Sequence, residues 1–480
     1  MSIRIVETVT AATTAELRLG REAAEARADV VELRIDGVRD LDLPAVLADR
    51  RAPVIVTCRP VWEGGKFDGL EPDRLRLLRR ARALGAEFID VEFRADWRSV
   101  AAIERPEPTA APAIPRDGLV LSFHDFAGVP PDLELIAAAM AGSGADVVKI
   151  AVTPSHLSDC EQLRRAGRLL RTGAVIGMGP AGVITRVAPH MFNSCWTYGG
   201  ELSSVGQMPA RDLRDIYGIG RVSADAALFG VVGRPVMHSR SPLLHNAAFR
   251  HEGLDAVYAP LEAHDFADFN AFARAFGVKG ASVTAPFKGD ACASAAASDA
   301  AAKETQAANT LRRTARGWTA ANTDGEGFLA PLAGVELCGI RAAVIGLGGA
   351  ARSVRHALTA SGAHVTLLGR DDLDRASEPW DLLVNATPVG TAPAVDESVL
   401  AGRSIRARIV YDLVYNPTDT QLLKDARASG ARTIGGMPML VAQACRQFEF
   451  WFGRPAPVEA YQRAAQALTA YETDDIRRVR

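Results

Sequence analysis

Two hydrophobic patterns alternate along the first part of the chain. Short runs rich in Val, Ile and Leu are separated by Ala-, Leu- and Arg-rich stretches with a helical period. Apolar runs of this length are typical of strands buried on both faces of a parallel sheet. The eight runs are Ile3–Thr10, Val30–Asp36, Val54–Arg59, Phe88–Phe93, Leu119–Phe123, Val147–Thr153, Ala174–Met178 and Ser194–Tyr198. This order predicts an α/β fold that begins with a (β/α)8 barrel over about residues 1–217.

Polar side chains stand near the ends of these predicted strands. In a (β/α)8 barrel the carboxyl ends of the strands build the active site. The residues at these positions are Glu32, Arg34, Arg59, Glu92, His124, Lys149 and Met178. We therefore expect a catalytic site at this end of the barrel.

A second α/β region follows a short segment without periodicity, at about 218–227. Within it, Ala342–Arg352 reads as a strand, a glycine turn and the start of a helix, the order of a dinucleotide-binding motif. Gly346 permits the turn and Gly348 lets the backbone approach a pyrophosphate. We expect three parts here: a substrate lobe at 228–330, a Rossmann lobe at 331–436, and C-terminal helices at 437–480 that return to the substrate lobe.

The end of the next strand bears on the choice of cofactor. Arg370 follows the run His364–Leu368, and an arginine there suits the 2′-phosphate of NADP. The adjacent Asp371 is the kind of residue that binds the ribose hydroxyl of NAD. NADP is the predicted cofactor, and NAD stays open.

Composition narrows the class of protein. The net charge of −2 gives no reason to expect nucleic acid or an anionic membrane surface as a partner, and no apolar stretch approaches a membrane span. The six cysteines lie far apart, without metal-ligand spacing, as is typical of a reducing compartment. The N-terminus enters a strand-like run at once, which leaves no room for a signal peptide. We expect a cytoplasmic enzyme of small molecules without a bound metal.

Lys149 is the only basic residue in the apolar run Asp146–Thr153. A buried ammonium must be paired or become neutral, and a neutral amine can form a Schiff base with a ketone. Only six of the 55 basic Lys and Arg residues are lysines, and arginine cannot act in this way. A nucleophilic lysine and a lysine that extends out of the strand end both remain open on this run alone.

The first half resembles type I 3-dehydroquinate dehydratase over nearly its whole length. The matching pieces are Glu32–Asp36, Thr57–Arg59, Glu63–Gly65, Ser122–Phe126, Lys149–Ala151, Met178–Gly179, Arg186 and Ser203–Gln207. The resemblance implies dehydration of 3-dehydroquinate to 3-dehydroshikimate through an imine on Lys149. It also implies that His124 moves the proton and that Glu32 orients His124. Further implied roles are substrate binding by Arg34, Arg59 and Arg186, with Arg186 on the carboxylate, and loop closure over the ring by Ser203 and Gln207.

The second half resembles shikimate dehydrogenase. The matching pieces are His238–Asn246, Val283–Lys288, Ala308–Thr310, Asn322–Gly325, Asn385–Gly390, Asp412–Pro417 and Met439–Gln443. The resemblance implies a catalytic pair of Lys288 and Asp324. It also implies carboxylate binding by Ser239 and Ser241, and ring contacts from Thr284, Asn309, Tyr415 and Gln443. Cofactor contacts are expected from Gly346, Gly348, Gly349, Ala350, Arg370, Asn385, Thr387 and Gly436.

Three positions depart from the second family's pattern. Ser282 stands where an Asn usually precedes Val-Thr, and Gly369 and Asp371 replace the usual Asn and Thr around the arginine. The two halves together resemble a fused enzyme in which the product of the first reaction is the substrate of the second. Two alternatives stay open: the same fusion acting on quinate or with NAD, and an inactive relative with a regulatory role or one surviving activity.

Overall fold

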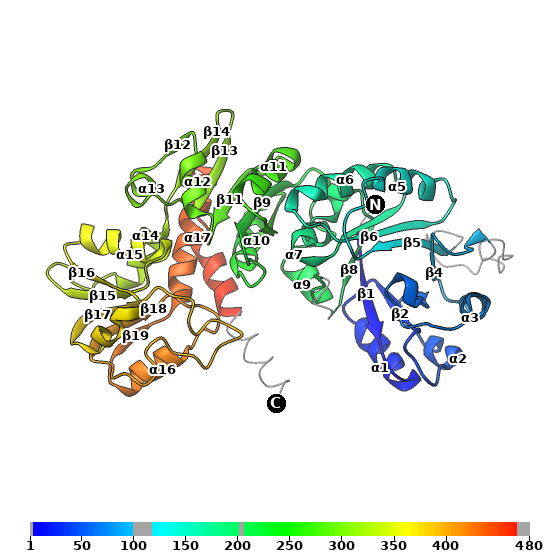
Figure 1. Ribbon diagram of the computed structural model, residues 1–480, viewed down its shortest axis with the longest axis horizontal. Helices are drawn as coiled ribbons and strands as arrows, with labels where there is room; N and C mark the ends of the chain where they lie inside the picture. The colour runs from blue at the N-terminus through cyan, green and yellow to red at the C-terminus, as the bar shows by residue number, and fades with distance from the viewer. Residues whose placement is uncertain (1–2, 99–117, 201–205, 468–480) are drawn as a thin grey trace. The chain divides into compact units, whose positions relative to one another are not determined.

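The computed structural model describes residues 3–98, 118–200 and 206–467. The chain divides into two compact units, and each is described separately below. One consists of Met1–Leu228 and Asp255–Gly277, and the other of Phe229–Leu254 and Val278–Arg480. Figure 1 follows the chain through both by colour, from blue at the N-terminus to red at the C-terminus.

Eight parallel strands form the sheet of the first unit, in the order β7-β6-β5-β4-β3-β2-β1-β8. They are β1 (Arg4–Thr10), β2 (Val30–Arg34), β3 (Val54–Thr57), β4 (Phe88–Glu92), β5 (Leu119–Asp125), β6 (Val147–Val152), β7 (Gly173–Gly177) and β8 (Trp196–Gly199). Strand β1 pairs with β8, and a parallel bridge between Gly173 and Ser194 joins β7 to the approach to β8. The sheet therefore curls into a nearly closed ring, and the predicted barrel is confirmed.

Helices follow most of these strands. They are α1 (Thr14–Ala24), α2 (Leu43–Leu47), η1 (Val61–Glu63), α3 (Glu71–Ala83), α5 (Leu133–Ala141), η2 (Leu157–Asp159), α6 (Cys160–Arg168), α7 (Gly179–Gly182), α8 (Ile184–Val187), η3 (Pro189–Phe192) and α9 (Ala210–Asp215). The unit also contains β10 (Ala256–Glu262) and α11 (Phe266–Phe276). Helix α1 begins where Thr13 and Glu16 cap each other's backbone N–H groups, a reciprocal capping box.

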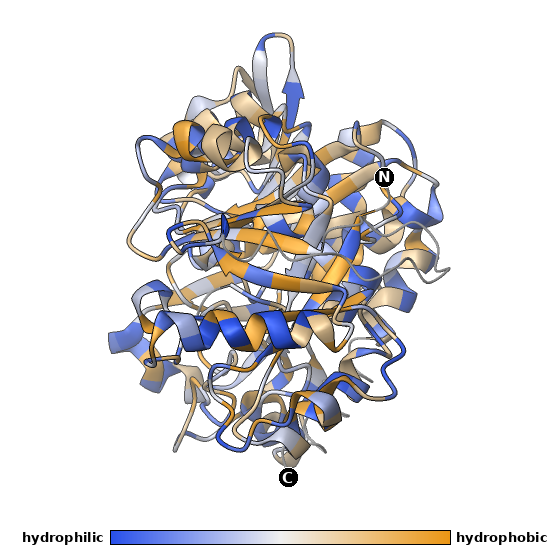
Figure 2. Cartoon of the chain, turned by 90° about the vertical axis from the view of Figure 1, so that its right-hand side faces the viewer, coloured by the Kyte–Doolittle hydropathy of each residue, from blue (hydrophilic) through white to orange (hydrophobic). Residues whose placement is uncertain are grey.

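Apolar side chains from successive strands pack inside the barrel. The buried cluster contains Val6, Val30, Ile55, Phe88, Val120, Val147, Ala151, Ala174, Ile176, Met178, Trp196 and Tyr198. Figure 2 shows these central strands mostly in orange, while the helices carry more blue. Side chains two residues apart in a strand share a face. Since Val147 belongs to the interior cluster, the strand also turns Lys149 into the barrel.

The second unit contains two sheets. One includes strands in the order β9-β11-β13-β14-β12, and the other has the order β16-β15-β17-β18-β19. The strands of the first are β9 (Ala227–Gly233), β11 (Gly280–Val283), β12 (Ala297–Ser298), β13 (Thr310–Thr314) and β14 (Gly317–Ala321). Its helices are α10 (Ser241–His251), α12 (Lys288–Ser294), α13 (Ala300–Thr305), α14 (Asp324–Leu329) and η5 (Ala330–Leu332).

The other sheet of this unit is parallel throughout. Its strands are β15 (Arg341–Ile345), β16 (His364–Leu368), β17 (Trp380–Asn385), β18 (Ala407–Asp412) and β19 (Arg432–Ile434), joined by α15 (Gly349–Ala360), η6 (Arg370–Ser377) and α16 (Gln421–Ala428). The strand order reverses at β15, and ligands of such sheets bind at the carboxyl ends beside that reversal. The predicted Rossmann fold is confirmed.

Helix α17 (Gly436–Phe452) returns from this sheet to the first one. Phe448 and Trp451 on it are buried, and the Trp451 indole N–H donates to the Leu311 carbonyl at 2.9 Å. The aromatic stretch of α17 therefore packs this helix against the sheet that contains β13. Gly327 on α14 permits the close approach, because a Cβ there would lie 2.5 Å from Gln443 Cγ.

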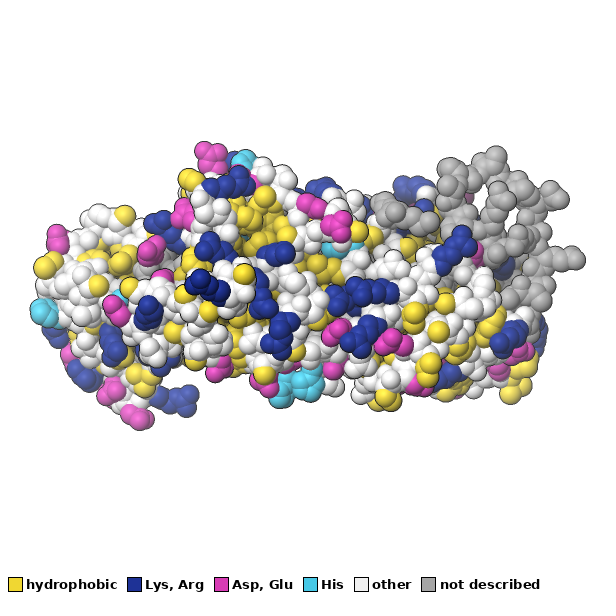
Figure 3. All heavy atoms as spheres, turned by 90° about the horizontal axis from the view of Figure 1, so that it is seen from above, with side chains coloured by type: hydrophobic (Ala, Val, Ile, Leu, Met, Phe, Trp, Pro, Cys, Tyr) yellow, Lys and Arg dark blue, Asp and Glu magenta, His cyan; other side chains and the backbone are white. Residues whose placement is uncertain are grey.

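Charged side chains of both signs are interspersed over the face of the molecule shown in Figure 3. Among the residues that the structure describes, no helix is long and apolar enough to cross a membrane.

Candidate active sites

The Lys149 side chain lies inside the barrel and is only 6 % exposed. Its ammonium is 3.0 Å from Glu32 Oε1 and 3.5 Å from Asp90 Oδ2, and it lies 4.2 Å from the centre of the Tyr198 ring. Lys149 therefore does not extend out of the strand end. Two carboxylates and an aromatic face surround its nitrogen, and such contacts stabilise a positive charge in a buried site.

Glu32 is the main partner of this lysine. Its Oε1 also accepts from the Thr57 hydroxyl at 2.9 Å, and its Oε2 accepts from the Thr8 hydroxyl at 2.8 Å. Burial alone would raise the pKa of Glu32, but the nearby positive charges of Lys149 and two arginines lower it to about 2. The carboxylate is therefore held ionised beside the amine.

The prediction that Glu32 orients His124 is wrong. The partner of His124 is Glu63, whose Oε1 lies 3.0 Å from the ring Nδ1 and accepts from the His124 backbone N–H at 2.9 Å. Glu63 ends the one-turn helix η1, directly before Gly64 in the left-handed region at φ 76°. That turn brings a carboxylate 61 positions away in sequence under the imidazole.

The protonation states of this pair differ from those of free side chains. Burial, reinforced by the positive charges of Arg59 and Lys149, lowers the pKa of His124 well below its usual value. Burial raises the pKa of Glu63 to about 7, despite the opposing charge of Arg59. His124 is thus a neutral imidazole at neutral pH, able to take up a proton beside a carboxyl group that ionises near pH 7.

Arg59 was expected to bind substrate, and in the structure it contacts polar side chains of β4 and β5. Its guanidinium is 3.0 Å from Asp90 and 2.6 Å from Glu92, and it donates to the Ser122 hydroxyl at 2.8 Å. Arg59 is 3 % exposed. These contacts hold Asp90, which also faces Lys149, in place.

The other predicted side chains of the barrel site have different surroundings. Arg34 makes a two-pronged ion pair with Asp36, both bonds at 2.9 Å. Arg186 is 2 % exposed, donates from Nε to the Gly206 carbonyl at 2.9 Å, and has its pKa lowered to about 10 by burial. Gln207 lies against Gly200. Ser203 lies outside the described residues.

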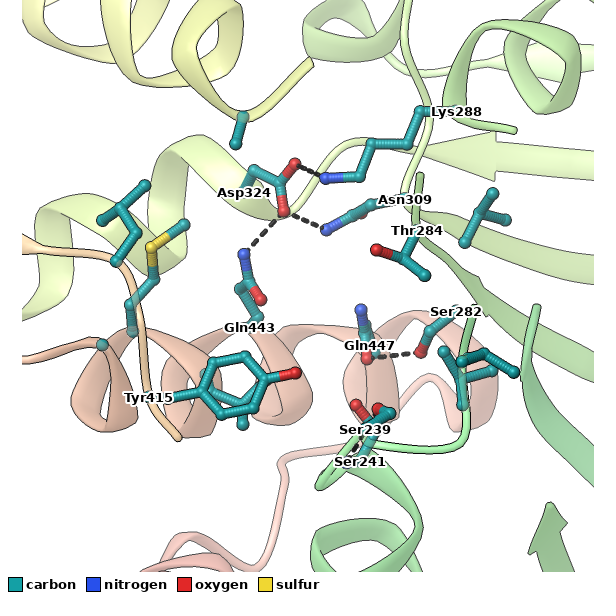
Figure 4. A pocket seen from close by; sticks show the side chains of 18 of the residues that line it. Ser239, Ser241, Ser282, Thr284, Lys288, Asn309, Asp324, Tyr415, Gln443 and Gln447 are labelled. Atoms are coloured by element: carbon teal, nitrogen blue, oxygen red, sulfur yellow. Dashed lines mark hydrogen bonds and ion pairs between the residues drawn. The ribbon is translucent and has the colours of Figure 1, made fainter. Parts of the chain in front are cut away.

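A second site is a pocket of about 180 Å³ in the other unit. Figure 4 shows its polar side chains converging from several elements. The predicted residues that line it are Ser239, Ser241, Thr284, Lys288, Asn309, Asp324, Tyr415, Gln443, Ala350 and Gly436. The structure therefore brings together side chains that are up to about 200 positions apart in the sequence.

A lysine–carboxylate pair stands at the centre of this pocket. Lys288, the first residue of α12, is 2.5 Å from Asp324 Oδ2, and Asp324 is the first residue of α14. The other oxygen of Asp324 accepts from the Asn309 amide at 2.7 Å and the Gln443 amide at 2.6 Å (Figure 4). Asp324 is 2 % exposed and has little contact with water. The donors Lys288, Asn309 and Gln443 therefore stabilise its carboxylate in place of water. A substrate carbonyl or hydroxyl beside this pair could exchange a proton with it.

The two serines lie at the opposite wall of the pocket from the lysine–carboxylate pair (Figure 4). Ser239 Oγ accepts from the Ser241 backbone N–H at 3.3 Å, where α10 begins. Burial raises the pKa of Tyr415, although a hydrogen bond with Ser239 opposes the shift. Neutral hydroxyls at a helix N-terminus suit a carboxylate.

Most of the expected cofactor residues lie just after the carboxyl ends of β15, β16 and β17, whereas Gly436 begins α17 after β19. Gly346 has φ 122°, and a Cβ there would lie 3.1 Å from the Ala386 carbonyl, so the turn requires glycine. A Cβ on Gly348, which precedes α15, would meet nothing within 4 Å. This open space over the N-terminus of a helix fits a pyrophosphate. Arg370 opens η6 just after β16.

The side chains of two expected cofactor residues, Asn385 and Thr387, form hydrogen bonds within the protein. Asn385 donates to Asp412 Oδ1 at 2.9 Å, and its oxygen accepts from the Thr387 N–H and hydroxyl at 3.0 and 2.7 Å. Their side chains shape the loop after β17.

The sequence prediction did not assign roles to three residues that the geometry singles out. Glu63 stood in a motif without a role, Asp90 was omitted, and Gln447 lines the second pocket beside Ser282. Features of the sequence pointed to two of them, Asp90 and Gln447. Asp90 and Glu92 alternate in an otherwise apolar strand, which places both on one face. Gln447 follows Gln443 by one helical turn.

Comparisons with known proteins agree with the division of the chain into two units. The model of type I 3-dehydroquinase matches residues 5–223. The shikimate dehydrogenase substrate binding domain matches residues 231–311, and the shikimate 5′-dehydrogenase C-terminal domain matches residues 436–466.

Similar proteins cover one unit or both. A chloroplastic bifunctional 3-dehydroquinate dehydratase/shikimate dehydrogenase of Arabidopsis thaliana is 31% identical over 92% of this chain and 80% of its own length. An NADP(+) shikimate dehydrogenase of Moorella thermoacetica is 37% identical over 51% of this chain and 94% of its own. A Thermus thermophilus shikimate 5-dehydrogenase, solved with NADP(H) and shikimate, is 30% identical with a TM-score of 0.45, over 50% and 99% of the two chains.

The match to the Arabidopsis protein runs through both units, and the family models divide at the same part of the chain as the two folds. The predicted family is thereby confirmed. The chain belongs to the family of bifunctional 3-dehydroquinate dehydratase/shikimate dehydrogenases.

Proposed function

We propose that this chain catalyses two consecutive steps. The barrel dehydrates 3-dehydroquinate to 3-dehydroshikimate, and the second unit reduces 3-dehydroshikimate to shikimate with NADPH. The observation that carries the proposal is that each unit contains its own lysine–carboxylate centre, Lys149 with Glu32 and Lys288 with Asp324. An inactive relative would be expected to lack one of them.

In the barrel, Lys149 attacks the substrate ketone and water leaves as the imine forms. Attack requires the neutral amine, so the proton on Lys149 passes to a neighbouring base, and the Glu32 and Asp90 carboxylates are within 3.5 Å. The imine acidifies the adjacent carbon, and His124 takes that proton and returns it to the departing hydroxyl. Hydrolysis of the imine then releases the product and restores Lys149. Arg186 is our candidate for the substrate carboxylate, with Arg34, Gln207 and Ser203 around the ring.

In the second unit, Ser239 and Ser241 hold the substrate carboxylate, and Thr284, Asn309, Tyr415 and Gln443 bind the ring substituents. Lys288 and Asp324 supply the proton to the ketone oxygen that becomes a hydroxyl. Bound NADPH supplies the hydride. Gly346 permits the turn after β15, and Gly348 leaves open space at the start of α15, where the pyrophosphate would lie. Gly349, Ala350 and Gly436 are further candidates for cofactor contacts, and Asn385 and Thr387 shape the neighbouring loop.

The change Arg370→Ala is expected to lower kcat/KM for NADPH by about 10- to 100-fold and to leave the value for NADH nearly unchanged, because one charge-assisted contact to the 2′-phosphate is lost. The matched control is Asp371→Thr, which removes an acid from the same turn and should raise the preference for NADPH. Initial rates with both cofactors give the ratio. A wild-type kcat/KM with NADH equal to or above that with NADPH contradicts the assignment.

The dehydratase should also depend on pH through Glu63. Its carboxyl ionises at about pH 7, and the ionised form stabilises the imidazolium that His124 becomes. The value of kcat/KM should therefore rise as the pH increases through about 7 and level off above it. Glu63→Gln should lower the rate and remove this rise. Profiles for both proteins test the point, and an unchanged rise near pH 7 in Glu63→Gln excludes Glu63 as its source.

A coupled assay that starts from 3-dehydroquinate tests the whole proposal. With NADPH, one protein should convert it to shikimate, and oxidation of NADPH should follow the appearance of 3-dehydroshikimate. Formation of 3-dehydroshikimate without oxidation of NADPH or NADH would leave only a dehydratase, and no reaction at all would indicate an inactive relative. Faster oxidation of quinate than of shikimate would assign the second unit to quinate instead.

The proposal includes a cytoplasmic location and small-molecule partners only. The widely spaced cysteines and the small net charge support both.

A further inference from the structure

Behind the substrate pocket of the second unit, four buried side chains form a chain of hydrogen bonds. Gln447 Oε1 accepts from the Ser282 hydroxyl at 2.8 Å and lies 3.1 Å from His245 Nε2. The other ring nitrogen, Nδ1, lies 2.9 Å from the Tyr461 hydroxyl. These residues come from β11, α10, α17 and the helix that follows α17. The chain thus connects the C-terminal part of the protein to the pocket wall.

Gln447 is the member of this hydrogen-bond chain whose amide can reach a ligand in the pocket. It is 5 % exposed, and it lines the cavity together with Ser282. In Figure 4 its nitrogen is directed toward the space between Thr284 and Gln443, away from Ser282. Among the described residues, Ser282 and His245 both contact the Gln447 oxygen, so the amide presents its N–H donors to the cavity.

The imidazole determines which end of the amide faces inward. Burial lowers the pKa of His245 to about 3, so the ring is neutral and carries one N–H. If Nε2 donates to the Gln447 oxygen, Nδ1 has to accept from the Tyr461 hydroxyl. The opposite tautomer would accept at Nε2 and would favour the reversed amide, with the oxygen facing the pocket. The first arrangement is the one in which Ser282 and Nε2 both donate to the Gln447 oxygen and Tyr461 donates to Nδ1.

Packing prevents the ring from turning. His245 and Tyr461 are both fully buried. The imidazole lies 4.9 Å from the Trp451 ring and meets the Tyr461 ring edge-on at 5.5 Å. A buried polar chain of this kind restricts orientation because each alternative leaves a donor or acceptor without a partner.

We propose that His245, held by Tyr461, is a positioning residue that turns the donor end of the Gln447 amide toward an oxygen of the bound substrate. This inference rests on the reductase activity proposed above and adds a determinant of substrate affinity to it. Ser282, where Asn is usual, supports the arrangement, because its hydroxyl donates to the same amide oxygen.

Three changes test this role in the full-length protein. His245→Phe keeps an aromatic ring and removes both nitrogens, and Tyr461→Phe removes only the hydroxyl. Each should raise KM for 3-dehydroshikimate about three- to tenfold, the effect of one misplaced hydrogen bond, with kcat changed less than twofold. His245→Gln can still donate to the Gln447 oxygen and should restore most of the affinity.

A double-mutant cycle separates positioning from packing. If His245 acts through Gln447, adding His245→Phe to Gln447→Leu should raise KM no further. Phe249→Leu is the matched control, because Phe249 packs 6.1 Å from the same imidazole; it should lower the melting temperature and leave KM unchanged. Additive effects of the two changes, or an unchanged KM in both His245→Phe and Tyr461→Phe, would overturn the inference. Absence of reductase activity in the wild type would instead refute the proposed function.

Discussion

Replacing Lys149 with alanine is expected to lower kcat for dehydration of 3-dehydroquinate by at least about 10⁴-fold, because the covalent route is removed altogether. Reduction of 3-dehydroshikimate by the same protein should continue, since Lys288 and Asp324 lie in the other unit. The two activities are measured separately, each from its own substrate.

The alanine variant has a structural cost that must be separated from the chemical one. Removing the ammonium leaves the buried Glu32 without its ion-pair partner, while Asp90 keeps Arg59, and the expected loss is about 3 kcal/mol in unfolding free energy. Lys149→Arg keeps the charge but cannot supply a neutral amine, so it should be equally inactive and more stable than Lys149→Ala. Lys303→Ala, an exposed lysine on α13, is the control for losing a lysine elsewhere. Substantial dehydration by Lys149→Arg would exclude the imine.

The second large effect is expected for Lys288→Met, which should lower kcat for reduction by about 10²- to 10⁴-fold, the usual contribution of a positioned proton donor. Dehydration should be preserved to within about twofold, since separate sites respond independently. Stopped or continuous assays of NADPH oxidation give the first value and product formation from 3-dehydroquinate the second. If a folded Lys288→Met protein loses both activities, the two centres are not independent.

Asp324→Asn is the companion change to Lys288→Met. Asparagine keeps the shape of the side chain but removes the charge that Lys288, Asn309 and Gln443 stabilise. It should therefore reduce kcat in the same range, and the double variant should be little slower than either single one, because paired residues act as a unit. Fully additive losses would show that the two side chains act separately.

The sequence predicted the folds well because both are set by repeated local patterns. The eight apolar runs correspond to β1 to β8, and the glycine turn before α15 lies at the predicted place. A lysine in an apolar strand was also informative by itself, since few arrangements permit one. These features depend on neighbouring residues and on strand periodicity.

The pairing of charged groups was harder to predict. Several carboxylates lie at the carboxyl ends of the barrel strands, and spacing along the chain does not say which one meets His124. Glu63 does so only because η1 and Gly64 turn the chain back after β3. Arg59 is a similar case. Its place after a strand predicted substrate binding, and its ion pairs with Asp90 and Glu92 become visible only in the folded barrel.

The His245 chain illustrates the same limit in the second unit. His245, Gln447 and Tyr461 are separated by up to 216 positions, and each resembles an ordinary helix residue. Their connection depends on how α10, α17 and the following helix pack around one buried ring. Tertiary packing of this kind leaves no periodic trace in a sequence.

The most direct test of the account is to reduce the enzyme with borohydride in the presence of 3-dehydroquinate and to map the modified peptide by mass spectrometry. A Schiff base on Lys149 predicts a stable adduct on the peptide that contains this residue, and no adduct in Lys149→Arg. An adduct on another lysine, or a protein that turns over substrate and yet gives no adduct, would contradict the central role of Lys149.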